Sequence, residues 1–481
     1  MRNWLALGYS FGYVFLVLAL AEIVGRKIKN KQISRKIIHI LCGNWIVIAF
    51  TCFDSLWAAV IPPISFIFIN YMSYRKDLFQ AMEGKKSMGT VYYAISLLAL
   101  TVSGWLLKFP AMAYTGILSM AYGDGLAAVL GEKFGSWKWD SKRDSKSYIG
   151  SAAVFVLSAG AALLVSIFFD LPQALPIALL CGAFALYVEL YGYNGCDNLS
   201  LPIGTATLYY YFHILRIRGE QNEFWLIAGI TLIILVAALS RDSITENGAG
   251  VAFLVGILVF ARGGFGLYGG LILFFIIGSV TSKFKKQKKK ASEKLQQRSG
   301  ARSWVQVLAN SAAIIAVLWL GQFSNEQRAA FLSAFSVLAA ATADTVSSDL
   351  GMLTRGKTFS ILTGKPVAKG LSGGVSVKGL VSGFLAAVAL ALPLMVRYHW
   401  REVLAVIGCG FLGTIVDSIL GDRLQVKYQA EDGTLTEVRL AGDGRERPKI
   451  RGFRWINNDA VNLITLFFVA LVSFWLFTEI L

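Results

Sequence analysis

The sequence predicts an all-α, polytopic integral membrane protein. Of its 481 residues, 56% are hydrophobic and only 16% are charged, and the mean hydropathy is +0.59. A soluble domain of this length would need more charged surface, so the excess apolar surface must face lipid. Apolar runs recur along the chain, and many approach the roughly 20 residues that a helix needs to cross a bilayer core of about 30 Å.

Sixteen runs are candidate spans, and we expect about 14–16 transmembrane helices. The short or glycine-rich runs 199–215 and 248–262 could instead be re-entrant. The candidate spans are 4–24, 38–54, 56–73, 88–107, 111–131, 148–169, 173–191, 199–215, 223–239, 248–262, 265–282, 303–322, 328–346, 378–396, 402–422 and 458–480.

The distribution of basic residues indicates the orientation. If the loop 26–36 is cytoplasmic, strict alternation places 38 of the 46 Lys and Arg residues on that side and the amino terminus outside. This bias is what the positive-inside rule expects. We therefore interpret the net charge of +17 mainly as a topology determinant, with attraction to anionic lipids or nucleotides as the alternative. Nucleic-acid binding is not indicated.

The cysteines and the amino-terminal residues indicate in which cellular membrane the protein lies. The five cysteines have no paired spacing, so neither a disulfide framework nor a zinc site is predicted. No Arg- and Ser-rich transit segment precedes the first span, which favours a bacterial inner membrane with the active sites facing the cytoplasm. An oligomer could form, but no pattern indicates one.

Three polar segments interrupt the apolar runs. The stretch 216–223 separates two blocks of spans, so we expect fused helical domains at 1–215 and 216–481. The segment 423–456 has turn signals between alternating residues, which predicts a small cytoplasmic hairpin near 425–450. The lysine-rich run 283–302 is interpreted as a cytoplasmic loop with a solvated helix.

In the first half, polar residues cluster at the predicted inner membrane edge. Lysines beside glycines and hydroxyls suit a phosphate chain, and nearby carboxylates suit a divalent cation that bridges phosphates. Each piece also has a structural interpretation: the GDG sequence at 123–125 could end a helix, the lysines could anchor spans, and His39 could be a packed histidine.

The order of these motifs resembles the CTP-dependent lipid-alcohol kinases, the phytol, dolichol and polyprenol kinase family. The resemblance covers about residues 20–215 and rests on RKIIH, KKSMGT, GDGLAAVLGEKFG, KSYIGSAA and DNLSLPI. It implies phosphorylation of a long isoprenoid alcohol by CTP with Mg²⁺. We expect His39 near the acceptor and Asp124 in catalysis, with Asp124 and Asp197 on the metal. The residues expected to bind CTP are Lys85, Ser87, Gly123, Gly125, Gly131, Lys133, Lys146 and Asn198.

A second constellation lies in the other half, where acidic residues at span ends flank a Gly- and Lys-rich stretch. Converging carboxylates and amides could hold one or two Mg²⁺ ions, and the Gly- and Lys-rich stretch could wrap phosphates. The alternatives are helix capping, pairing with arginines, or a cation pathway. The expected metal ligands are Asp344, Asp349, Asp417, Asp422, Asn458 and Asp459, with Asp344 and Asp417 also catalytic, and the expected phosphate-binding residues are Lys357, Lys369, Gly373 and Gly374.

This half resembles the membrane family that includes plant phytyl-phosphate kinase, over about residues 225–481. The motifs are SITENGAGVAFLVG, QVLANSAA, ADTVSSDLG, GGVSVKG, VDSILGDRLQ and NNDAVN. Asp349 stands where a Glu is common in that family, and Asp422 where a small residue is common.

Together the two resemblances imply a bifunctional salvage kinase. The first half would convert an isoprenoid alcohol to its monophosphate, and the second half would convert the monophosphate to the diphosphate, with CTP or ATP as donor in that second step. Two alternatives stay open: a cytidylyltransferase that makes a CDP-lipid, and a transporter of a cation or a phosphorylated lipid. The expected partners are a nucleoside triphosphate, the isoprenoid alcohol and its phosphate, and membrane lipids.

Overall fold

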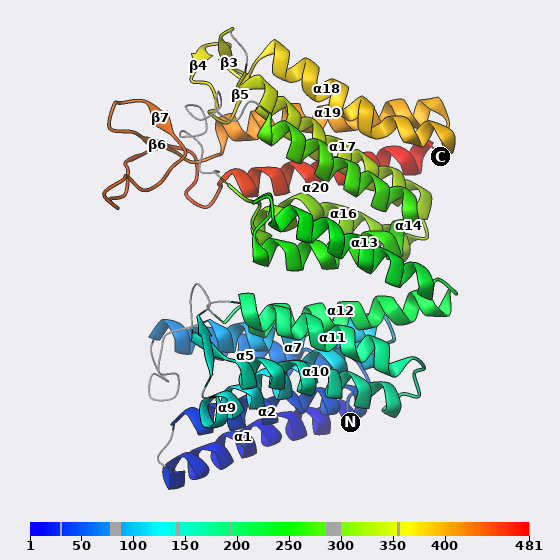
Figure 1. Cartoon of the computed structure of the whole chain (residues 1–481), viewed down its shortest axis with the longest axis vertical. Coiled ribbons are helices and arrows are strands. Elements are labelled where there is room, and N and C mark those ends of the chain that lie inside the picture. The colour runs from blue at the N-terminus through cyan, green and yellow to red at the C-terminus, as the bar shows by residue number, and fades with distance from the viewer. Residues whose placement is uncertain are drawn as a thin grey trace. The chain divides into compact units, whose positions relative to one another are not determined.

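The computed structural model describes residues 1–28, 31–76, 88–135, 137–140, 145–192, 195–284, 300–353 and 356–480. In this part of the chain, 13 helices are long and apolar enough to cross a membrane, which confirms the predicted polytopic all-α fold. The chain divides into two compact units, Met1–Trp225 and Leu226–Leu481 (Figure 1). Each unit is described separately below.

The first unit is a bundle of helices with one short hairpin of two antiparallel strands, β1 and β2. Its elements are α1 (Arg2–Ile28), α2 (Lys31–Gly43), α3 (Trp45–Thr51), α4 (Leu56–Ala59), α5 (Ile61–Lys76), α7 (Gly89–Leu106), α8 (Pro110–Leu118), the π-helix η1 (Ser119–Asp124), α9 (Gly125–Phe134), β1 (Lys138–Asp140), β2 (Ser145–Ser147), α10 (Tyr148–Phe168), α11 (Ala174–Tyr191) and α12 (Asp197–Ile217). The helix α13 (Gln221–Leu239) begins in this unit and continues into the second.

The second unit combines long helices with two small antiparallel sheets, which lie at one end of its helices (Figure 1). The sheets have the strand orders β4-β3-β5 and β7-β6-β8. Beyond α13, the elements are α14 (Glu246–Lys283), α16 (Trp304–Ser324), α17 (Gln327–Gly351), β3 (Thr358–Ser360), β4 (Pro366–Val367), β5 (Gly374–Val375), α18 (Val377–Ala391), the 3₁₀-helix η2 (Leu392–Val396), α19 (Trp400–Arg423), β6 (Lys427–Gln429), β7 (Leu435–Thr436), β8 (Lys449–Arg451) and α20 (Asn458–Ile480).

The number of candidate spans differs from the expected sixteen for three local reasons. The run 111–131 is interrupted by η1, so it consists of shorter helices. The run 199–215 lies in α12, which also carries polar residues such as Asp197 and His213 and is not among the 13 spans. The runs 248–262 and 265–282 are both contained in the 38-residue helix α14.

The helix α14 is a folded-back pair of helices joined at Gly264. A straight helix of 38 residues would be about 57 Å long, well beyond a bilayer core. Gly264 has φ 64° and ψ −167°, a backbone conformation that only glycine adopts readily. The Lys283 ammonium at the end of α14 donates to the carbonyl of Arg241, just before α14 begins, at 3.0 Å. The two ends of α14 therefore lie together.

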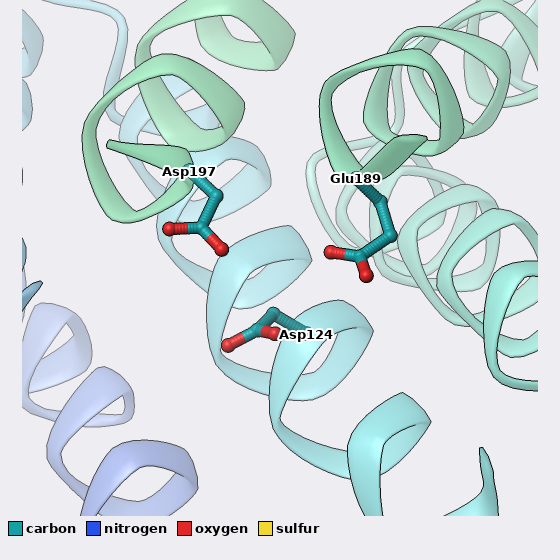
Figure 2. A group of neighbouring side chains, drawn as sticks. All are labelled: Asp124, Glu189 and Asp197. Atoms are coloured by element: carbon teal, nitrogen blue, oxygen red, sulfur yellow. The ribbon is translucent and has the colours of Figure 1, made fainter. Parts of the chain in front are cut away.

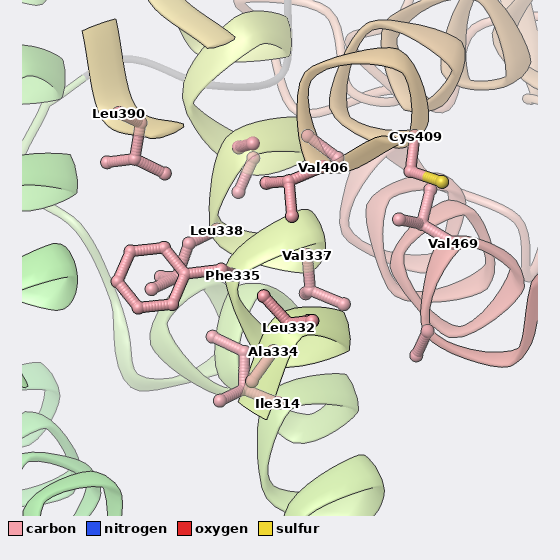
Figure 3. Packing of buried hydrophobic residues seen from close by; sticks show 14 of the residues in the cluster. Ile314, Leu332, Ala334, Phe335, Val337, Leu338, Leu390, Val406, Cys409 and Val469 are labelled. Carbon is pink, nitrogen blue, oxygen red and sulfur yellow. The ribbon is translucent and has the colours of Figure 1, made fainter. Parts of the chain in front are cut away.

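The helix α17 forms the centre of the second unit and packs against α14, α16, α18, α19 and α20. Its residues 329–343 are buried, apart from the half-buried Phe331, which is typical of a helix surrounded by others. Figure 3 shows Leu332, Phe335 and Leu338 among the core side chains around it. Further along α17, alanines permit close contact: Gly410 and Gly413 of α19 pack against Ala339 and Ala340. The same buried helix carries Asp344 and Asp349 in its last turns.

The extramembrane segment after α19 is larger than the predicted hairpin. The strands β6 and β7 form the expected hairpin, and β8 adds to the other edge of β6. This third strand follows a long connection, so its pairing is not visible in a local pattern. The sheet of β3, β4 and β5 is likewise not evident from the sequence.

The conformation of Gly264 yields a prediction. Gly264→Ala should destabilise the protein by about 1–3 kcal/mol, because a Cβ is strained in this backbone region. Gly269→Ala is the matched control, since Gly269 lies in the same helix without a positive φ and a Cβ added there would have no neighbour within 4 Å. Thermal unfolding midpoints in detergent measure both. Equal midpoints for the two variants would contradict the strained turn.

Candidate functional site

Asp124 is positioned by a local change in helix geometry. Ser119–Asp124 forms a π-helix between α8 and α9, and such segments are frequent at functional sites. Because the helix continues through residues 123–125, the GDG sequence does not end a helix. Its glycines allow close packing: a side chain at Gly123 would collide with Ser158 of α10, and one at Gly125 with Ile40 of α2.

Three carboxylates meet next to this segment. Asp124, Glu189 near the end of α11 and Asp197 at the start of α12 each offer an oxygen, and these oxygens lie within 4.8 Å of one another. Figure 2 shows the three side chains gathered from separate helices. All three are half-buried. Two oxygen ligands on opposite sides of one Mg²⁺ ion are about 4 Å apart, so the spacing of these carboxylates is close to what a divalent cation needs.

Two lysines lie against this cluster. Lys36 Nζ is 3.4 Å from Asp124 Oδ2, and Lys146 Nζ is 2.8 Å from Glu189 Oε1. Lys146 also donates to the backbone carbonyl of Glu189. Three neighbouring carboxylates repel one another, and two ammonium groups compensate only part of their charge. A bound cation would complete the neutralisation.

His39 is both packed and in contact with the cluster. Its Nε2 lies 3.2 Å from Asp124 Oδ2 and 3.3 Å from the Met120 carbonyl, so two acceptors favour the tautomer with the proton on Nε2. Tyr93 packs edge-on at 4.8 Å between ring centroids, and its hydroxyl donates to the His39 carbonyl at 2.7 Å. The ring is thus fixed in an orientation that holds the Asp124 carboxylate.

The start of α12 places one more polar group near Asp197. The backbone N–H of Asn198 donates to Asp197 Oδ1 at 3.0 Å, and Ser96 Oγ donates to the backbone carbonyl of Asn198 at 2.6 Å. The side-chain oxygen of Asn198 is buried and has no hydrogen-bond partner within the part of the chain that the structure describes. A buried oxygen of this kind normally pairs with water or a ligand.

Other residues expected at the nucleotide have different surroundings. Lys133 is exposed, with its ammonium 5.3 Å from the centre of the Phe134 ring. Gly131 packs against Ser147, whose hydroxyl accepts from the Gly150 amide and caps α10. Lys85 and Ser87 lie outside the described residues. The nucleotide-binding roles of these residues stay predictions.

Sequence reasoning did not single out Glu189. A signal was present, because Glu189 is the only acidic residue in the apolar run 174–191. A lone ionisable group in a membrane helix is costly unless it has a partner or a function. Lys36, by contrast, belongs to the RKIIH motif of the polar cluster predicted above, and it lies three residues before His39 on the same helix face.

In the second unit, packing gathers the predicted acidic residues at one end of the helices. Asp344 and Asp349 are in the last turns of α17, and Asp417 is near the end of α19. Asn458 and Asp459 begin α20, which packs against both helices. Among the described residues of this unit, no three carboxylates approach one another as closely as those of the first unit.

Hydroxyl and amide groups contact several of these side chains. Ser282 of α14 donates to Asp349 Oδ2 at 2.8 Å, and Thr465 of α20 lies 3.4 Å from Asp417 Oδ2. The Asn458 side chain donates to Asn462 at 3.3 Å. Their metal-binding roles stay predictions.

Asp422 lies in a separate buried network. Its carboxylate accepts from Ser360 of β3 and from Arg451 of β8, the latter at 2.9 Å, and Lys427 Nζ is 3.8 Å away. Lys427 is fully buried and also donates to the Ser372 carbonyl at 2.6 Å. Asp422 therefore joins both small sheets to the end of α19.

The Gly- and Lys-rich stretch lies beside this network. Gly373 has φ 85° and packs directly on the Asp422 backbone, so no other residue fits there without strain. Gly374 begins β5, Lys369 is half-buried, and Lys357 is exposed.

Comparison with known proteins assigns a family. Residues 229–470 match the family model described as integral membrane protein DUF92. The chain belongs to the DUF92 family. The matched region lies wholly in the second unit, which we call the DUF92 unit.

Curated relatives include proteins that the chain covers over most of their length. Phytol kinase of Synechocystis is 30% identical over 211 residues, which are 43% of this chain and 90% of that protein. The chloroplastic protein VTE6 of Arabidopsis thaliana is 28% identical, over 51% of this chain and 68% of that protein. An uncharacterized membrane protein of Methanocaldococcus jannaschii is 31% identical, over 43% of this chain and 86% of that protein. No solved structure matches the chain.

The buried lysine of the DUF92 unit yields a prediction about pH. Burial, followed by the nearby Arg451, lowers the pKa of Lys427 to about 8, whereas an unfolded lysine titrates near 10.4. Between these values the unfolded chain binds a proton that the folded chain does not, so stability rises with pH in this window. The unfolding free energy of the native protein, relative to Lys427→Met, should increase by about 3 kcal/mol from pH 8 to pH 10.5.

Chemical unfolding in detergent at several pH values measures this difference. Below about pH 7 it should be constant, because both the folded and the unfolded lysine are then protonated. A difference that does not change up to pH 10.5 would mean that Lys427 is solvated.

Proposed function

We propose that the first unit is a CTP-dependent kinase that converts a long-chain isoprenoid alcohol to its monophosphate. The observation that carries the proposal is the cluster of Asp124, Glu189 and Asp197 with a lysine on each side. The similarity to phytol kinases, which are named for an isoprenoid alcohol substrate, supports the same assignment. The motif order from RKIIH to DNLSLPI adds the expectation of CTP as donor.

A divalent cation fits this site, since the cluster offers three carboxylates of the hard oxygen type that Mg²⁺ prefers. Asp124, Glu189 and Asp197 would hold it. When bound, it would neutralise the negative charge that develops on the phosphoryl group during transfer.

The chain's own groups account for the rest of the step. The alcohol oxygen attacks the γ-phosphorus of CTP, the bond from that phosphorus to the bridging oxygen of the β-phosphate breaks, and CDP leaves. The hydroxyl proton passes to the Asp124 carboxylate, which Lys36 and His39 hold in place. Lys146 pairs with Glu189 and so orients it, and we expect the same ammonium to neutralise charge on the nucleotide phosphates.

We further propose that the DUF92 unit phosphorylates the monophosphate to the diphosphate. A terminal phosphate oxygen attacks the γ-phosphorus of CTP or ATP and the nucleoside diphosphate leaves, so no strong base is needed. Asp344 and Asp417 at the helix ends, with the Gly- and Lys-rich stretch at 357–374, are the residues expected to act here. In this proposal the chain is a fusion of two kinases in a bacterial inner membrane, with both sites facing the cytoplasm.

Metal binding to the first unit can be tested without activity. Addition of Mg²⁺ at 100 times its dissociation constant should stabilise the folded protein by about 2.7 kcal/mol and raise its melting temperature. Glu189→Gln should remove most of this increase, because it deletes one charge of the cluster. Glu132→Gln is the matched control, a carboxylate on the neighbouring α9 outside the cluster. An equal response of both variants would argue against the cluster as the metal site.

Activity tests the two steps separately. Membranes that contain the protein, given γ-labelled CTP and phytol or geranylgeraniol, should produce labelled monophosphate and then diphosphate. Asp124→Asn should lower monophosphate formation by about 10²-fold to 10⁴-fold, because the group that takes the proton is lost. The same variant should still phosphorylate supplied monophosphate.

Asp344→Asn should show the reverse pattern, with monophosphate accumulating. Loss of both steps in either variant would contradict separate sites. Label transfer from α-labelled CTP to the lipid would instead indicate cytidylyl transfer. Flux across liposomes without nucleotide consumption would indicate a transporter.

A further inference from the structure

An apolar groove lies in the DUF92 unit between α13 and the second half of α14. Its volume is about 570 Å³, within the range of roughly 300–1,000 Å³ that ligand sites have. Ile234 and Ala238 of α13 form one wall, and Ile272 and Ile276 of α14 form the other. All of its lining residues belong to this one unit.

A smaller cavity of about 100 Å³ adjoins the groove. Both are lined by Ile234, Ile272 and Phe275, so they meet at these residues. Besides apolar side chains, the lining of the smaller cavity includes Arg302, Gln306 and Asn310.

Cations gather at one end of this space. Arg241 lies two residues after the end of α13, and Lys283 is the last residue of α14. Both line the groove, and Lys283 donates to the Arg241 carbonyl at 3.0 Å. The Arg302 guanidinium lies over the rings of Phe274 and Phe275, at 5.6 and 5.4 Å from their centres. Within the part of the chain that the structure describes, no acidic side chain lines either cavity. An apolar channel with a cationic end is complementary to an anionic amphiphile.

The cationic end lies next to the acidic end of α17. Ser282, adjacent to Lys283, donates to Asp349 at 2.8 Å. Gly278 lies against both Arg302 and Thr345, so the guanidinium approaches the turn of α17 that carries Asp344. A headgroup held by the cations would therefore be near the residues proposed for the second phosphoryl transfer.

We propose that this groove binds the isoprenyl monophosphate, with the isoprenoid chain between α13 and α14 and the phosphate at Arg241, Lys283 and Arg302. This inference rests on the proposed function of the DUF92 unit. One groove between two helices suits a single chain with a small headgroup better than a phospholipid with two acyl chains. A phosphate monoester also presents more charge to the three cations than a phosphodiester does.

Photolabelling tests the position of the site. A geranylgeranyl monophosphate with a diazirine near the end of its chain should label peptides from α13 and from residues 265–284. Ala237→Trp should reduce the labelling at least tenfold, because Ala237 lines the groove and the indole would fill it. Leu232→Trp is the matched control, since Leu232 lies on the same helix, is 57% exposed and does not line the groove. Equal labelling of both variants, or labelling elsewhere, would overturn the proposal.

Charge removal tests the headgroup position. Arg241→Gln and Lys283→Gln should each raise the dissociation constant of the monophosphate about tenfold, as expected for loss of one charge-assisted contact. Binding of the uncharged alcohol should stay unchanged. Phosphatidic acid in excess should compete poorly, and effective competition would identify the groove as an ordinary phospholipid site.

The two proposals can fail independently. Labelling of the groove without any conversion of monophosphate to diphosphate would keep the binding site and reject the kinase function. Conversion that proceeds normally in Ala237→Trp would keep the kinase function and reject the groove.

Discussion

Carboxylates among membrane helices need compensating charge, and this constraint shapes both units. In the first unit Asp124, Glu189 and Asp197 lie so close together that the lysines beside them balance only part of their charge. In the DUF92 unit the acidic side chains lie further apart, and Asp422 is balanced by Arg451 and Lys427. The first arrangement leaves negative charge that a cation would balance, while in the second the ion pairs join small sheets to a helix end.

The separation of these carboxylates depends on how closely the backbones approach. In the first unit, Gly123 and Gly125 on either side of Asp124 let α10 and α2 come close to the π-helical segment. In the second, alanines of α17 face glycines of α19, and Gly373 admits the Asp422 backbone. The small residues thus determine how closely the helices approach, and this in turn determines the distances between their polar side chains.

Structural features that depend on contacts between residues close in sequence can be predicted from the sequence, and features that depend on distant contacts cannot. Apolar runs of membrane length predict the helices, because each run satisfies its own backbone hydrogen bonds. The hairpin of β6 and β7 is also local and was predicted. The pairing of β8 with β6, the merging of two runs at Gly264 and the network around Asp422 depend on contacts between distant residues, which a single sequence does not reveal.

The candidate site shows the same limit at the level of side chains. Motif order indicated Asp124 and Asp197 but not which carboxylate completes the group, since Glu189 belongs to an apolar helix far along the chain from Asp124. Its membership becomes visible only when the packing of α11 beside α12 is known.

A fusion of two lipid kinases needs no channel between its sites. The isoprenoid tail keeps the monophosphate in the membrane, so the intermediate reaches a second site by diffusion within a thin layer rather than through bulk solvent. Confinement of this kind raises the effective concentration of an intermediate without any direct contact between the sites. A fusion of this kind then has two requirements. The first is that the alcohol is phosphorylated at the membrane surface, and the second is that another site recognises the newly added phosphate. In the groove proposed above, the cations at the ends of α13 and α14 would meet the second requirement, because they would distinguish the phosphate from the alcohol by charge while the apolar walls would accept the same tail.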